Sequence, residues 1–178
     1  MKRSLFFFAA CFIAVAVISS CEQSREVSNL EQNLNEIINK YGNWTDNELA
    51  RESIKTELVS FFNDSKGKSF QSFYNGELDF DEVITTPEGH NNNTDSVAAR
   101  FNCSLSFYPS QQDNSTWIKF VVVGKLPKDE AIKLNRETKY RVDGNILGYI
   151  EDVNIDRLIG RIEMGMLVME ELKFLSDK

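Results

Sequence analysis

Apolar residues recur at helical spacing in the segment that begins near residue 30. Successive apolar positions stand three or four residues apart, which places them on one face of a helix. These positions are Leu30, Leu34, Ile37, Ile38 and Tyr41. Gly42-Asn43 then predicts a helix end. We therefore expect an amphipathic helix that packs its apolar side on the rest of the chain.

A second helical pattern follows at once. Thr45 and Glu48 have the spacing of a capping box, which predicts a helix beginning there. The apolar positions after it are Leu49, Ile54, Leu58, Phe61 and Phe62. The polar run of residues 63–68 predicts the end of this helix, so residues 30–65 form a helical segment.

After residue 68 the pattern changes to the period of two that is typical of strands. Residues 78–84 predict one strand with an acidic side. Phe101, Cys103, Leu105 and Phe107 alternate strictly and predict a half-exposed strand. The polar turn of residues 110–115 leads to a continuous apolar run over residues 117–123, which predicts a central strand. These two strands should form a hairpin.

The C-terminal third is less regular. Residues 128–135 predict a short helix, and residues 140–147 predict a strand that Gly144 bends. The apolar residues between 155 and 169 fit either a helix or a strand. We favour a strand over residues 162–174, because Gly160 and Gly165 would each cost a long helix about 1 kcal/mol.

This order of elements predicts an α+β fold with two N-terminal helices followed by a five-stranded antiparallel β-barrel. A short helix between the third and fourth strands is the order of an OB-fold. The segment of residues 131–146, with its glycine in the fourth strand, resembles the tRNA-anticodon-binding-like OB-fold family of bacterial lipoproteins. The resemblance implies an OB-like barrel over residues 70–175. The alternative is an open antiparallel sheet with both helices packed on one face.

The N-terminus has the features of an export signal. Lys2 and Arg3 precede an apolar run from Leu5 to Ile18, whose 14 residues are too few to span a bilayer. The sequence Ile18-Ser19-Ser20-Cys21 resembles the lipobox of bacterial lipoproteins. It implies a signal peptide over residues 1–20, a lipid on Cys21, and a polar tether over residues 21–29. The protein would then be anchored to a membrane of the cell envelope, outside the cytoplasm.

Charge and cysteine content narrow the possible partners. The chain has 20 basic and 27 acidic residues, a net charge of −7, which opposes binding to the phosphate backbone of nucleic acids. Cys11 lies in the signal peptide and Cys21 would carry the lipid, so Cys103 alone remains. We expect no internal disulfide and interpret Cys103 as a small buried residue of a strand.

No group of residues has the spacing of a catalytic, cofactor-binding or metal site. His90 is the single histidine and lies in a polar loop, which favours a solvated side chain. Acidic pairs occur at Asp79 and Asp81 and at Asp152 and Asp156. Most of these carboxylates should belong to exposed faces. Three aromatic residues of the strand region are candidates for ligand binding: Tyr108, Trp117 and Tyr140.

We therefore expect a non-enzymatic binding or scaffold module for a protein or glycan partner of the envelope. Two alternatives stay open: a carbohydrate-active or other hydrolase that uses the acidic pairs, and an OB-fold nucleic-acid binder, which would rest on fold analogy alone. Asp95-Ser96-Val97 resembles the acceptor motif for O-linked glycans on exported proteins of Bacteroidetes. That resemblance implies that residues 91–97 lie at the surface.

Overall fold

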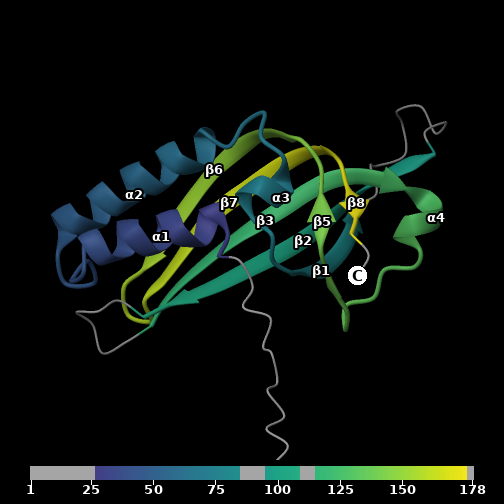
Figure 1. Cartoon of the computed structure of the whole chain (residues 1–178). Coiled ribbons are helices and arrows are strands. Elements are labelled where there is room, and N and C mark those ends of the chain that lie inside the picture. Colours follow the sequence, from purple (N-terminus) through teal and green to yellow (C-terminus); the bar gives the residue numbers. More distant parts are fainter. Residues whose placement is uncertain (1–26, 85–94, 109–114, 176–178) are drawn as a thin grey trace, which may run out of the picture.

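The computed structural model describes residues 27–84, 95–108 and 115–175 (Figure 1). The predicted signal peptide, Cys21 and His90 lie outside the described residues. The helices within them are α1 (Asn29–Lys40), α2 (Glu48–Asn63), α3 (Phe70–Phe73) and α4 (Lys128–Ala131). The strands are β1 (Leu78–Ile84), β2 (Ser96–Phe107), β3 (Thr116–Pro127), β4 (Lys139–Tyr140), β5 (Val142–Asp143), β6 (Ile146–Asp156), β7 (Arg161–Glu171) and β8 (Lys173–Phe174).

The two long helices form where the apolar spacing predicts them. In α1 a capping box holds the first turn: Glu31 N donates to Ser28 Oγ, and Ser28 N donates to the Glu31 carboxylate. The buried face of α1 is Leu30, Leu34 and Ile38, and that of α2 is Ala50, Ile54, Leu58 and Phe62. The predicted helix faces are therefore largely confirmed.

Two predictions at the start of α2 are wrong. The cap is Asn47, whose side-chain oxygen accepts from Ala50 N at 3.2 Å, and not Thr45. Residues 41–46 form turns instead, and the side chain of Trp44 within them is fully buried. Leu49 lies about 100° around the helix from the buried Ala50, on the outer side, where it is 80% exposed.

The strands form a six-stranded sheet in the order β4-β1-β2-β3-β7-β6, and β5 and β8 form a separate pair. β2 and β3 are the predicted hairpin, with an unbroken register from Ser96 opposite Pro127 to Phe107 opposite Thr116. β3 is central as expected, and β7 confirms a strand in the C-terminal region. β3 and β7 run parallel, whereas the other neighbouring strands are antiparallel.

The predicted five-stranded OB-like barrel over residues 70–175 is wrong, because the sheet is open. β7 pairs in parallel with β3 rather than closing the sheet against β1, and β6 lies on the outer side of β7. The far side of β1 pairs with the two-residue β4. The observed architecture is close to the alternative, an open sheet with the helices on one face, except that the sheet is mixed.

The segment that was predicted as one bent strand instead crosses one end of the sheet. The chain leaves β4 at one edge, passes through β5 and Gly144, and begins β6 at the other edge. Gly144 has a φ of +154°, and a Cβ there would lie 1.9 Å from the carbonyl oxygen of Glu171. Only glycine allows this close approach of two backbones.

The helices and the sheet share one hydrophobic core. α1 and α2 lie side by side over one face of the sheet, and α3 lies beside them (Figure 1). Aromatic rings fill the layer between: Phe62 of α2 contacts Phe73, Phe120 and Tyr149 with ring centroids 5.2 to 5.7 Å apart. Cys103, predicted as a buried strand residue, is 2% exposed in this core.

Candidate functional site

The face of the sheet that carries no helix is apolar along its centre. Val121 of β3 is the register partner of Met166 of β7, and Met166 is the partner of Ile150 of β6. Val123 and Val168 form the next pair on the same face. Ile150 is 54% exposed and the others are half-buried. We call these residues the open-face strip: Val121, Val123, Ile150, Met166 and Val168.

A hollow of about 700 Å³ lies over Val121, Ile150 and Met166 of this strip, and irregularities in the strands explain its shape. The register shifts between Lys119 and Val121 on β3 and between Glu151 and Asn154 on β6. Gly165 of β7 stands between these points with a φ of +88°, and a Cβ there would lie 2.4 Å from the carbonyl oxygen of Ile150. Bulges bend strands and increase their twist, so the sheet is hollowed where β6 and β7 depart from regular pairing.

Tyr149 fixes the other side of the same region. Its ring packs against Phe62 beneath the helices, and its hydroxyl donates to the carbonyl oxygen of Met164. Burial raises the pKa of Tyr149 above its usual range, and the nearby carboxylates of Glu151 and Asp152 raise it further. The phenol therefore stays protonated and holds β6 against β7 below the hollow.

Charged side chains of both signs surround the strip. Lys119 of β3 is the register partner of Glu163 of β7, and Arg161 Nε lies 3.3 Å from Glu163 Oε1. On the β1 side, Arg100 Nε lies 3.3 Å from Asp81 Oδ2. The face therefore combines an apolar centre with a rim of paired charges, which is the anatomy of a protein–protein interface.

The acidic residues named from the sequence do not gather into one pair. Asp79 and Asp152 both line the hollow, but they stand on β1 and β6, four strand positions apart. At about 4.8 Å per step this is roughly 19 Å along the sheet, whereas glycosidase carboxylates lie about 5–9.5 Å apart. Asp81 faces Arg100, and Asp156 accepts from Leu158 N at 3.0 Å. These placements give the hydrolase alternative no observation in its favour.

The three aromatic candidates fall into two places. Trp117 is 42% exposed at one end of the open face, where its register partners are Ser106 and Arg161. Tyr108 follows β2 at the same end and is 78% exposed. Tyr140 lies on β4, where its ring packs against Phe101 and Phe174 and its hydroxyl accepts from Asn135 N at 2.7 Å. Tyr140 is thus a packing residue, apart from the other two.

Sequence reasoning missed the open-face strip. The signal was present in residues 117–123, where valine stands at positions facing both ways, but it was interpreted only as the sign of a central strand. In the structure Val122 is fully buried and Val121 is half-buried on the other face. An apolar run in a central strand is therefore compatible with a sheet covered on one side.

Among the residues that the structure describes, no group of three or more His, Cys, Asp or Glu side chains is placed to hold a metal ion. Within the same part of the chain, no helix has the length and apolar character needed to cross a membrane. No protein-family model, no curated protein and no solved structure matches this chain. The site is therefore interpreted from its own geometry.

Proposed function

We propose that this protein is a lipid-anchored binding module of the cell envelope that binds a partner protein with the helix-free face of its sheet. The observation that carries the proposal is the open-face strip, a run of aliphatic side chains across three neighbouring strands that no described segment covers. Contiguous exposed apolar surface on a soluble domain marks an interaction site.

The chemistry of the face favours a protein over a glycan. Sugars stack on aromatic rings, and the centre of this face is aliphatic, with Trp117 only at its end. A rim that holds Lys119, Arg161 and Glu163 offers both charge signs to a complementary protein surface. The nucleic-acid alternative loses its basis, since it rested on a barrel that the sheet does not form and conflicts with the net charge of −7.

Site-specific photocrosslinking in cells tests the proposal. A photoreactive benzophenone residue at Val121 or Met166 should give a covalent adduct with one protein species, and the same residue at Thr56, on the exposed side of α2, should give none. An adduct that glycosidase removes and protease does not would assign the face to a glycan. Equal adducts at Thr56 and Val121, or none on the open face, would contradict the proposal.

The membrane anchor needs a separate measurement, because Cys21 lies outside the described residues. We expect mass spectrometry of the native protein to find Cys21 as the N-terminal residue with acyl chains attached. A chain that keeps Met1 and an unmodified Cys21 would remove the anchor from the proposal and leave the crosslinking result unaffected.

A further inference from the structure

Part of β2 has a neighbouring strand on one side only, although β2 itself lies between β1 and β3 in the sheet. β1 pairs with β2 only as far as Asn102, which lies opposite Asp79. Beyond that point residues 104–107 pair with β3 on one side, and no strand among the described residues pairs with them on the other. We call residues 104–107 the β2 edge. In an antiparallel strand alternate residues direct both main-chain groups to the same side, so two of these four direct their N–H and C=O groups away from β3.

The β2 edge lacks the charges, prolines and bulges that protect many natural sheet edges. Its sequence, Ser104-Leu105-Ser106-Phe107, has no charge and no proline, and the register of β2 with β3 is unbroken through it. The outer edge of β6 is different: it carries Glu151 and Asp152, and the register with β7 shifts twice. The first residue of β6, Ile146, is also bonded in both directions to residues 67 and 68.

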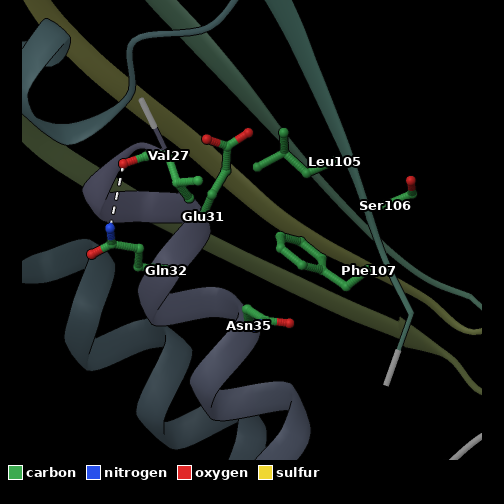
Figure 2. Close-up of a pocket in the computed structure, with 7 residues that line it drawn as sticks. All are labelled: Val27, Glu31, Gln32, Asn35, Leu105, Ser106 and Phe107. Carbon is green, nitrogen blue, oxygen red and sulfur yellow. Dashed lines mark hydrogen bonds between the residues drawn. The ribbon is translucent and has the colours of Figure 1, made fainter. Parts of the chain in front are cut away.

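A groove of about 430 Å³ lies between the β2 edge and α1 (Figure 2). Leu105 and Phe107 form its sheet side, and Val27, Gln32 and Asn35 lie on the side of α1. Its one formal charge, Glu31, already accepts from the N–H and the hydroxyl of Ser28. The groove is thus a partly apolar space with one carboxylate, already hydrogen-bonded to Ser28, beside main-chain groups that can form a further ladder.

We infer that the β2 edge binds an extended segment of another polypeptide, which adds to the sheet as a strand and places alternate uncharged, apolar side chains in the groove. Strand addition takes its affinity from main-chain hydrogen bonds and its specificity from pockets for alternate side chains. The lining, which is uncharged apart from the hydrogen-bonded Glu31, matches this occupant. The binding surface lies on the α1 side and the edge, so it does not depend on the open-face strip.

Two other occupants fit less well. The chain's own residues 22–26 precede the groove, but their sequence, Glu-Gln-Ser-Arg-Glu, contains no apolar side chain to fill it. A second copy could pair its own β2 edge, but its Leu105 and Phe107 are 8% and 9% exposed and belong to its own core. It would therefore supply a backbone and leave the groove without side chains.

The test uses the full-length protein in detergent and a fluorescein-labelled, end-capped heptapeptide of alternating threonine and valine. Two further peptides carry N-methyl groups, one on the threonines and the other on the valines. Strand addition uses the N–H groups of only one alternate set, so we expect one methylated peptide to bind at least tenfold more weakly and the other to bind about as well as the parent. Fluorescence anisotropy measures the three affinities.

Variants of the protein complete the experiment. Asn35→Trp should fill the groove and weaken binding of the parent peptide at least tenfold, whereas Thr56→Trp, the same change on the exposed side of α2, should leave it unchanged. No binding at millimolar peptide, or equal weakening by both methylated peptides, would overturn the inference. Concentration-dependent dimers that Asn35→Trp dissolves would assign the edge to a second copy and also overturn it.

Discussion

Both faces of β3 carry apolar residues, but these residues have different surroundings. Ile118, Phe120 and Val122 point toward the helices and are 0–2% exposed, whereas Val121 and Val123 point the other way and stay half-buried. The centre of the strand has apolar residues on both sides, but only one side is covered by described segments. The comparison teaches that the helices, and not the composition of the strand, decide which apolar residues stabilise this fold.

The largest effect should come from the covered face. Phe62→Ala removes a ring that contacts Phe120 and Tyr149 in the aromatic layer, and we expect it to lower the free energy of unfolding by about 3–5 kcal/mol. Urea denaturation of the purified protein measures this. Trp117→Ala removes an aromatic ring from the open face and should cost less than about 1 kcal/mol. Similar losses of stability for both variants would contradict the difference between the covered and the open face.

A buried hydrogen bond gives the next effect. Trp44 Nε1 donates to Thr116 Oγ1 at 3.3 Å, and both side chains are fully buried at the start of β3. Thr116→Val keeps the shape but leaves the indole N–H without this acceptor, which should cost about 1–3 kcal/mol. Ser106→Ala removes a hydroxyl from the open face and should change the urea midpoint very little. If Thr116→Val left the free energy of unfolding unchanged, this hydrogen bond would not stabilise the turn between α1 and α2.

A carboxylate on the helix side should make stability depend on pH. Burial acts to raise the pKa of Asp143, but hydrogen bonds from Gln71 N at 2.9 Å and Ser69 Oγ at 2.7 Å outweigh it and lower the pKa below its usual value. Because the folded-state pKa is lowered, the stabilisation is present above the unfolded pKa, near 4, and is lost as the pH falls through the folded one.

The variant Asp143→Asn checks this assignment. We expect it to lower stability at pH 7 by about 1 kcal/mol, the size of a typical net hydrogen bond, and to reduce the further loss between pH 5 and pH 2. Urea denaturation across this pH range gives both quantities. If the variant lost as much stability between pH 5 and pH 2 as the parent protein, a group other than Asp143 would be the one that titrates.

The smallest effect comes from the open-face member of a matched pair on β3. Val121→Thr places a hydroxyl on the open face, where water solvates it, and should change stability by no more than about 0.5 kcal/mol. Val122→Thr makes the same change one residue along, at a fully buried site, and should cost about 1–3 kcal/mol. Equal costs at the two sites would show that something covers both faces in solution.

The sequence predicted the elements that depend on local periodicity. It did not predict which strands that are distant in the chain pair with one another. The spacing of Leu30, Leu34 and Ile38 identified a helix face correctly, because that face is set within one element. The predicted barrel was wrong because β3 pairs with β7 in parallel. The alternation of apolar and polar residues along a strand does not depend on which strand lies beside it, so the sequence could not show this pairing. Trp117 was recognisable as a candidate from its residue type, but the open-face strip exists only once β3, β6 and β7 are aligned.

The parallel pairing of β3 with β7 also bears on the order in which the parts of the sheet form. The meander of β1, β2 and β3 and the hairpin of β6 and β7 each form from contiguous chain, but they can pair only after the connecting residues 128–145 cross the end of the sheet. Non-local pairings of this kind form slowly. Because β1, β2 and β3 precede the β6–β7 hairpin in the chain, we expect the β3 edge to stay unpaired until that hairpin forms, and misassembly between chains to begin at β3.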